Sequence, residues 1–438
     1  MTRPLGWLGI VRLGLVQSAI GSIVMLATSL LNRVMVVEYA LPAALPAGLV
    51  AWHYAVQLSR PAWGHGSDRG RRRTPWIVGG MVVLGLGVTL AVQSLGLLAA
   101  RSGWGFALAI AAFSLIGAGV GAAGTSLLAL LATRVAPERR AAAASITWIM
   151  MVAGIVVTAG VAGSLIDPFS LPRLEAVAGG VVAAALLVSI AAVWGIERTA
   201  TPPFEEARSS AAFGAALREM MADATARRFT LFVFLSMLAY SMQDLILEPF
   251  AGLLFGFTPG ESTRLSGVQH GGVLVGMIVA GIGGSAFGGR SQAGLRPWIV
   301  GGCAGSALAL GGLSLAARAG PGWPLEANIA LLGFANGIFA VAAIGSMMAL
   351  AGGGTGGREG IRMGVWGAAQ AIAFGLGGLI GAVGVDAGRA LTGSTARTFT
   401  IVFAIEALLF VLAASLALRG GRSAGATPSF APATGSAG

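Results

Sequence analysis

The sequence predicts an all-α polytopic membrane protein with twelve transmembrane helices in two six-helix pseudo-repeats. Composition points to the membrane, because apolar residues make up 56% of the 438 residues and charged residues only 10%. A soluble protein carries charge on about a quarter of its residues. A duplication is visible in residues 66–80 and 288–302, which align without a gap and share Pro-Trp-Ile-Val-Gly-Gly. Since this stretch recurs half a chain length later, we expect two copies of one unit.

The apolar runs define the expected helices, since a membrane-spanning helix needs about 20 mostly apolar residues. Twelve runs meet this requirement: 12–36, 44–63, 75–98, 105–133, 142–165, 175–196, 229–254, 267–289, 297–317, 326–351, 362–386 and 398–418. The longest polar stretch between them, 197–228, predicts a cytoplasmic linker between an N-terminal bundle over 1–196 and a C-terminal bundle over 229–422. Residues 423–438 are rich in Gly, Ala, Ser and Pro and predict a disordered tail.

The placement of arginine predicts the orientation. All 28 basic residues are Arg, and they give a formal net charge of +11. If the N-terminus lies inside, 21 of them fall in cytoplasmic segments and six on the opposite side, with Arg33 left in the first span. Because cytoplasmic loops carry the excess of basic residues, we expect both termini in the cytoplasm. The positive charge is therefore interpreted as an orientation signal and not as a nucleic-acid surface.

Corresponding spans of the two halves also end alike, the fifth at Asp167 and the eleventh at Asp386. Two parallel six-helix repeats, each with a charged loop after its second helix, describe the major facilitator architecture. The loop over 64–73 resembles the loop pattern of that superfamily, in which Gly is followed after three residues by Asp and Arg. It departs from the pattern because Gly70 comes one position early, and the second copy of the loop has lost the Asp.

That resemblance predicts a gating loop, in which an acid and several arginines pair with helix ends in one conformation and release them in another. The predicted gating residues are Gly64, Asp68, Arg69, Arg71, Arg72 and Arg73. A solvated basic loop that only sets topology, in a chain no longer used for transport, explains the same residues equally well.

A narrower resemblance runs from the first span to the eleventh. It rests on residues 31–38, 73–75, 242–250 and 367–375, and on Asp386. These stretches are similar to the PucC and LhaA proteins of purple phototrophs, also named the bacteriochlorophyll delivery family of the major facilitator superfamily. The sequence of residues 73–77 most resembles the family branch that is encoded near the bacteriochlorophyll synthase genes.

The resemblance implies a membrane factor for bacteriochlorophyll handling or delivery and for assembly of light-harvesting and photosynthetic complexes. It implies a bacterial inner (intracytoplasmic) membrane, with bacteriochlorophyll or a precursor as bound cargo. The lipid bilayer is one partner, and bacteriochlorophyll synthase and light-harvesting or reaction-centre polypeptides are further candidates; nucleic acid is not. Two alternatives stay open, namely a secondary active transporter of a small solute and a non-catalytic accessory subunit of bacteriochlorophyll synthesis.

We expect no enzymatic activity. The sequence shows no nucleophile triad, no metal cluster and no Asp-rich prenyl diphosphate motif. Transfer of a prenyl group to a chlorin would need carboxylates to hold magnesium diphosphate, whereas the expected cytoplasmic loops are dominated by Arg. The protein is therefore predicted to have no catalytic residues and no firm cofactor or metal of its own.

Charged residues at membrane depth are costly and are functional candidates by default. Arg33 and Glu38 lie toward the outer end of the first span, and Asp244 and Glu248 toward the outer end of the seventh. Asp244 and Glu248 are spaced i,i+4 and share one helix face. Our hypothesis is that Arg33 pairs with Asp244 or Glu248 across the interface of the two spans. The alternatives are side chains that snorkel to water and a direct ligand or proton site.

Five residues are candidates for binding pigment or other cargo. His53 and His270 lie in comparable spans of the two halves, and an imidazole can ligate the magnesium of a bacteriochlorin. Gln57 is i,i+4 from His53, and Gln269 is adjacent to His270, so either amide could bond a ring nitrogen or a carbonyl on the macrocycle. Gln370 lies within the resembling stretch 367–375. The simpler interpretation of both histidines is an interior side chain with ordinary hydrogen bonds.

Overall fold

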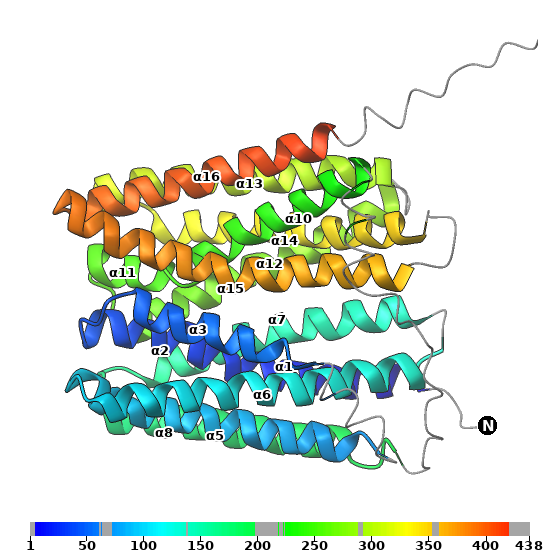
Figure 1. Ribbon diagram of the computed structural model, residues 1–438, viewed down its shortest axis with the longest axis horizontal. Coiled ribbons are helices and arrows are strands. Elements are labelled where there is room, and N and C mark those ends of the chain that lie inside the picture. Colours follow the sequence, from blue (N-terminus) through cyan, green and yellow to red (C-terminus); the bar gives the residue numbers. More distant parts are fainter. Residues whose placement is uncertain are drawn as a thin grey trace, which may run out of the picture.

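Figure 1 shows the computed structural model as a bundle of long helices that run side by side. The structure describes residues 5–60, 63, 72–136, 139–197, 218, 222, 224–287, 292–352 and 359–419. Every regular element within these ranges is helical. The predicted tail, 423–438, and most of the predicted linker, 197–228, lie outside the described residues.

The first part of the chain forms helices over the apolar runs expected from the sequence. They are α1 (Trp7–Met25), η1 (Leu26–Leu30), α2 (Leu31–Arg33), η2 (Val34–Glu38), α3 (Ala44–Gln57), α5 (Thr74–Ala99), α6 (Gly103–Arg134), α7 (Arg140–Leu165) and α8 (Leu171–Val193). Pro75 and Pro172 stand in the first turns of α5 and α8, where the missing N–H has no helical partner to lose.

The second part is also helical throughout its described residues. Its elements are α10 (Ala224–Asp244), α11 (Leu247–Phe255), α12 (Pro259–Phe287), α13 (Gln292–Ala319), η4 (Gly320–Gly322), α14 (Leu325–Gly352), α15 (Glu359–Thr392) and α16 (Thr395–Arg419). The start of α12 precedes the predicted 267 because a capping box fixes it. The N–H of Thr258 donates to Glu261 Oε2 (2.8 Å), and the N–H of Glu261 donates to Thr258 Oγ1 (3.1 Å).

Eleven helical segments in the described residues are long and apolar enough to cross a membrane. The one remaining predicted span, the second along the chain at 44–63, is shorter than expected. Helix α3 covers only Ala44–Gln57 and is followed by a turn at Leu58 and Ser59. The backbone carbonyl of Val56 accepts the N–H of Ser59 there. The sequence thus predicted an all-helical membrane protein correctly, while its second span is a helix of 14 residues.

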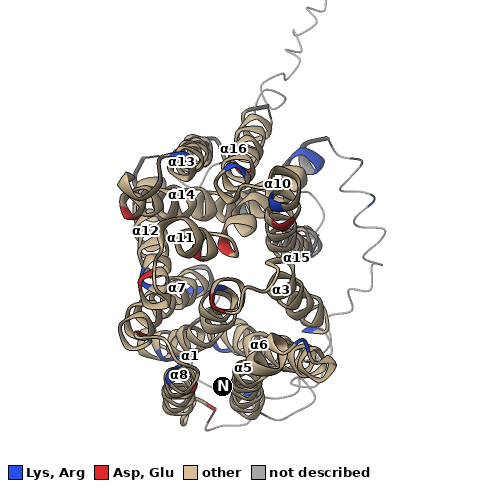
Figure 2. Cartoon of the chain, turned by 90° about the vertical axis from the view of Figure 1, so that its left-hand side faces the viewer, with Lys and Arg blue, Asp and Glu red and all other residues tan. Residues whose placement is uncertain are grey.

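Two hydrophobic cores hold the described residues together. Nearly all members of the first core lie between Ile10 and Ile196, and the second core runs from Phe232 to Ala414. Between the two cores, α12 packs on α7 and α15 packs on α3. Figure 2, which looks along the helices, shows these two pairs on opposite sides of the centre of the bundle.

In each of these two helix pairs, an aspartate of one core accepts hydrogen bonds from the backbone of the other core. Asp167, just after α7, accepts the N–H of Gly260 (3.1 Å) in the first turn of α12. Asp386, on α15, accepts the N–H groups of Ala43 (3.0 Å) and Ala44 (2.7 Å) at the start of α3. Each aspartate therefore caps the N-terminus of a helix of the other core.

Candidate functional site

The first membrane span is irregular where it faces the second part of the chain. Its α-helix is interrupted by two π-helical segments, η1 over Leu26–Leu30 and η2 over Val34–Glu38. π-Turns are rare and are frequent at functional sites. They re-aim the side chains that follow them, and here those side chains include Arg33 and Glu38.

Arg33 is enclosed, with a side chain that is 2% exposed, and each of its three guanidinium nitrogens has a partner. It forms an ion pair with Glu38, donates from Nε to Ser262 Oγ (3.1 Å) and donates from a terminal nitrogen to the carbonyl of Phe257 (2.6 Å). The hypothesis of an ion pair from Arg33 to Asp244 or Glu248 is therefore wrong. The wider π-turn explains the difference, because it brings position i+5 onto the face of position i, which an α-helix does not.

The seventh span is broken at the same depth. Helix α10 ends at Asp244, and α11 begins at Leu247. Asn32 of the first span reaches the break, where its side-chain amide donates to the carbonyl of Leu245 (2.7 Å). Irregular backbone at membrane depth is tolerated where protein or a cavity covers it, and broken helices often surround the binding sites of transporters.

Glu248 begins the outer half of the broken span and is bonded from two sides. Ser29 of the first span donates to Glu248 Oε1, and Ser29 also lies 3.1 Å from the hydroxyl of Ser266 on α12. The second carboxylate oxygen of Glu248 is buried without a hydrogen bond. Arg33 attracts Glu248 only through space. A serine, and not the arginine, therefore joins Glu248 to the first span.

Asp244 ends the inner half of the broken span, at a point where three other helices contribute neighbouring side chains. Tyr54 of α3, Tyr240 of α10 and Glu406 of α16 are its electrostatic neighbours. The side chain of Gln269 on α12 faces the carboxylate. Asp244 Oδ1 nevertheless has no hydrogen bond, and neither does the amide nitrogen of Gln269.

Glu406 is a site residue that the sequence reasoning missed. Its side chain is fully buried, and neither carboxylate oxygen has a hydrogen-bond partner. The signal was present, because Glu406 is the single acid within the apolar run 398–418, and an ionisable residue inside a membrane span is a functional candidate by default.

His53 on α3 has no free ring nitrogen. Its Nδ1 lies 2.8 Å from the carbonyl of Val50, and its Nε2 lies 2.8 Å from the side-chain amide of Gln57. Gln57 is held in turn by Arg60, which donates to the amide oxygen. Since the carbonyl can only accept, Nδ1 carries the proton and Nε2 accepts from Gln57.

His270 on α12 differs from His53 at one atom. Its Nδ1 lies 2.9 Å from the carbonyl of Ser266, which places the proton on Nδ1. No described residue bonds to its Nε2, and the side chain is half-buried. Ser262, Ser266 and His270 follow one another at i,i+4 spacing, so His270 shares the α12 face that meets the first span. The lone pair of Nε2 is oriented and free.

The remaining predicted residues lie elsewhere. Gln370 on α15 is half-buried, with its amide nitrogen 3.8 Å from the sulfur of Met237. Of the predicted gating loop, Gly64, Asp68, Arg69 and Arg71 lie outside the described residues. Arg72 is exposed, while the guanidinium of Arg73 donates to the carbonyl of Ala129 (2.9 Å) and to Thr133 (2.7 Å). No group of three or more His, Cys, Asp or Glu that could hold a metal occurs in the described residues.

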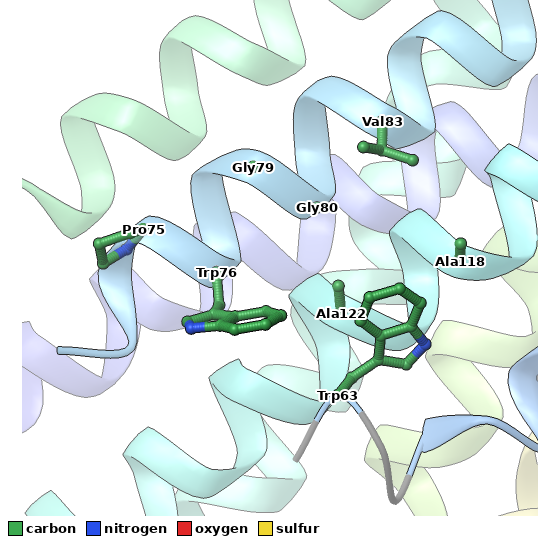
Figure 3. Close-up of a pocket in the computed structure, with 8 residues that line it drawn as sticks. All are labelled: Trp63, Pro75, Trp76, Gly79, Gly80, Val83, Ala118 and Ala122. Atoms are coloured by element: carbon green, nitrogen blue, oxygen red, sulfur yellow. The ribbon is translucent and has the colours of Figure 1, made fainter. Parts of the chain in front are cut away.

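An apolar groove of about 300 Å³ lies far along the bundle, around the first copy of the repeated sequence. Figure 3 shows Trp63 and Trp76 facing each other across it, with Gly79 and Gly80 of α5 and Ala118 and Ala122 of α6 beside them. The centroids of the two indole rings are 6.4 Å apart. The indole N–H of Trp63 donates a hydrogen bond to Ser59 Oγ (2.9 Å). This groove suits hydrocarbon and offers no side-chain ligand for a metal.

The comparisons with known proteins assign the chain to a family. A family model described as PUCC protein matches residues 30–423. The chain belongs to the PUCC protein family. The bacteriochlorophyll synthase 44.5 kDa chain of Rhodobacter capsulatus is 52% identical over 94% of this chain and 95% of the relative. The protein PucC of Rhodobacter capsulatus is 30% identical over 94% of this chain and 93% of the relative.

Solved structures that resemble this PUCC family member include transporters. A bacterial homologue of the human lysosomal transporter Spinster, in an inward-facing and occupied conformation, superposes with a TM-score of 0.68 at 14% identity, over 94% of this chain and 96% of that one. A peptide transporter in complex with alafosfalin gives a TM-score of 0.69 at 13% identity, over 96% and 97%. These likenesses show a transporter-like fold, as the sequence predicted.

Proposed function

We propose that this chain is a non-enzymatic membrane factor that holds bacteriochlorophyll or a precursor and delivers it during assembly of light-harvesting and photosynthetic complexes. The observation that carries the proposal is the 52% identity, over nearly the full length of both chains, with a relative named bacteriochlorophyll synthase 44.5 kDa chain. The transporter-like fold supports a protein that holds and releases a cargo, and the described residues offer no metal cluster for the chemistry of a synthase.

Within this proposal, His270 is the residue that binds the pigment. The central magnesium of a bacteriochlorin takes an axial ligand from above or below the ring, and a neutral imidazole supplies one when its other nitrogen is fixed by a hydrogen bond. His270 meets that requirement, with Nδ1 bonded to Ser266 and Nε2 free. Gln269, the adjacent residue, has an unpartnered amide nitrogen that can donate to a polar group of the cargo. His53 is excluded because Gln57 occupies its Nε2.

Two six-helix repeats with the N- and C-termini in the cytoplasm complete the proposal. The packing pairs support the repeat, because α5–α6 and α1–α7 of the first part recur as α13–α14 and α10–α15 of the second. The cross-core pairs α7–α12 and α3–α15 correspond in the same way. The arginine bias supports the orientation, and bacterial relatives linked to pigment support an inner membrane.

The second candidate is a secondary active transporter of a small solute. It is favoured by the likeness to transporters and by buried acids with unbonded oxygens beside a broken span, which is where transporters bind substrate and coupling ions. A transporter predicts solute movement in vesicles that contain this protein alone. A pigment-delivery factor predicts pigment or pigment-bearing partners in the purified protein.

The test is purification of the full chain in mild detergent from a host that makes bacteriochlorophyll. We expect bacteriochlorophyll, its synthase or antenna polypeptides to co-purify, and loss of the gene to lower the yield of assembled complexes. A protein that is free of pigment and partners and moves a small solute across vesicles would overturn the proposal in favour of the transporter.

A further inference from the structure

The break between α10 and α11 brings together the least satisfied polar groups of the described residues. Unbonded buried atoms occur on Asp244, on both sides of the Gln243 amide, on Gln269 and on both oxygens of Glu406. The side chains of Gln243 and Glu406 are fully enclosed, and Gln269 is 4% exposed. Buried polar atoms in native proteins nearly always have partners. Several unsatisfied groups at one break therefore point to a ligand.

The geometry specifies the charge of that ligand. Asp244 is the last residue of α10, and the C-terminal end of a helix carries a partial negative charge from its free carbonyls. Glu406 adds a second acid within electrostatic range. Among the described residues, neither acid has an ion pair, and Arg33, on the facing span, is committed to Glu38. Since an uncompensated buried carboxylate is costly, the site favours a positive ligand.

The geometry also limits the size of the charge. Divalent cations such as Mg²⁺ and Ca²⁺ take six or more oxygen ligands with several carboxylates, and the described residues hold no group of three acids or histidines. A small monovalent cation needs less, namely one carboxylate, amide oxygens and the carbonyls at the end of a broken helix. Asp244 supplies the carboxylate at the end of the broken helix, and Gln269 supplies the amide that faces it.

We propose that Asp244, with Gln269 and Glu406, forms a binding site for a monovalent cation, either H⁺ or Na⁺. The electrostatic neighbours of Asp244 are Tyr54 on α3, Tyr240 on α10 and Glu406 on α16. Gln269 on α12 faces its carboxylate, and Glu248 follows four residues later on α11.

Helix α15 also packs on α10. It meets α10 through Gly377 and Gly381, where a Cβ would lie 2.6 Å from the carbonyl of Leu238 and 2.8 Å from that of Met242. At these two positions α15 brings no side chain toward α10. Because the site joins residues of α3, α12 and α16 at the break in the seventh span, occupancy by a cation would stabilise the packing of both parts of the chain around it.

The experiment measures thermal unfolding of the full chain in detergent, with no pigment added. In one arm, NaCl replaces N-methylglucamine chloride at constant pH and ionic strength. In the other arm, the pH is lowered stepwise through the neutral range without sodium. We expect Tm to rise by a few degrees in the sodium arm if the ligand is Na⁺, or in the pH arm alone if it is H⁺, because a ligand that binds only the folded state stabilises it.

Asp244→Asn should abolish the response, and Glu326→Gln, which changes an exposed acid at the start of α14, should keep it. If Asp244→Asn does not fold, Gln269→Leu and Glu406→Gln keep Asp244 in place, and both should weaken the response. A wild-type Tm that is unchanged in both arms, or variants that respond like Glu326→Gln, would overturn the site. Because no pigment takes part, neither result depends on the pigment-delivery proposal.

Discussion

His53 and His270 stand in comparable helices and make the same first hydrogen bond, yet they differ in chemical availability. In both, Nδ1 is bonded to a backbone carbonyl three or four residues earlier. On His53, Gln57 then occupies Nε2, whereas His270 has an aliphatic neighbour, Leu274, at the same i+4 position. One glutamine thus turns a ligand into a structural side chain. The same contrast extends to charges, since each guanidinium nitrogen of Arg33 has a partner, while Asp244 Oδ1 and both oxygens of Glu406 have none.

The largest expected effect is on stability and concerns the buried Arg33, whose guanidinium nitrogens all have partners. Arg33→Ala leaves Glu38, Ser262 and the carbonyl of Phe257 without their partner. Removal of one member of a buried ion pair costs about 3–5 kcal/mol, and we expect about 3 kcal/mol because Glu38 is 31% exposed. Denaturant or thermal unfolding in detergent measures it. The exposed Arg318→Ala is the matched control, with an expected change within about 0.5 kcal/mol; equal effects of the two variants would contradict this role of Arg33.

The next effect is on pigment retention and separates the two histidines directly. His270→Leu should lower co-purified bacteriochlorophyll roughly tenfold or more, because loss of an axial ligand worth about 1.4 kcal/mol changes binding by that factor. His53→Leu should leave the ratio of pigment to protein within about twofold while it lowers Tm, because the amide nitrogen of Gln57 loses its acceptor and the carbonyl of Val50 loses its side-chain donor. Absorbance of the pigment per mole of purified protein measures both. A larger loss for His53→Leu than for His270→Leu would reverse the assignment.

A smaller effect is expected at the two cross-core caps. Asp386→Ala removes the acceptor for two N–H groups of α3, and Asp167→Ala does the same for Gly260 of α12. Loss of an N-cap costs about 1 kcal/mol. Because each cap joins the two cores, each variant should also increase the accessibility of nearby engineered cysteines to a water-soluble thiol reagent. Asp386→Asn keeps only one of the two accepting oxygens and should therefore show a smaller loss of stability and a smaller rise in labelling than Asp386→Ala; labelling that rises equally in the two variants would argue against capping.

The smallest expected effect tests whether one glutamine separates the two histidines. Gln57→Leu frees Nε2 of His53 at little cost in volume, so the first half should gain a weak pigment site. We expect a modest rise in pigment per protein, within about twofold, which persists when His270→Leu is added. No gain in that double variant would mean that the surroundings of His53, and not Gln57 alone, exclude the pigment.

The sequence predicted what depends on apolar length and charge placement. Eleven of the twelve predicted spans could be read from the sequence, because the length of an apolar run is a local property of the chain. The transporter-like fold and the importance of Asp386 could be read as well. The partner of Arg33 could not, because i+5 pairing with Glu38 needs a π-turn that no residue pattern announces. The shortened second span depends on the turn at Leu58 and Ser59. The availability of the two histidines depends on side-chain orientation, which spacing alone leaves open.

The two aspartate caps have a consequence for the kinetics of opening. Asp167 and Asp386 join the same two hydrophobic cores on opposite sides of the bundle. When one aspartate is released, the other still keeps the two cores close together. The released carboxylate then stays close to its N–H donors, at a high effective concentration, and rebinds them before the two cores separate. Partial opening is therefore short-lived, and complete opening requires both caps to be released together. The end of the bundle where α3 and α12 begin should therefore open rarely, and the opposite end should be the faster route for a cargo.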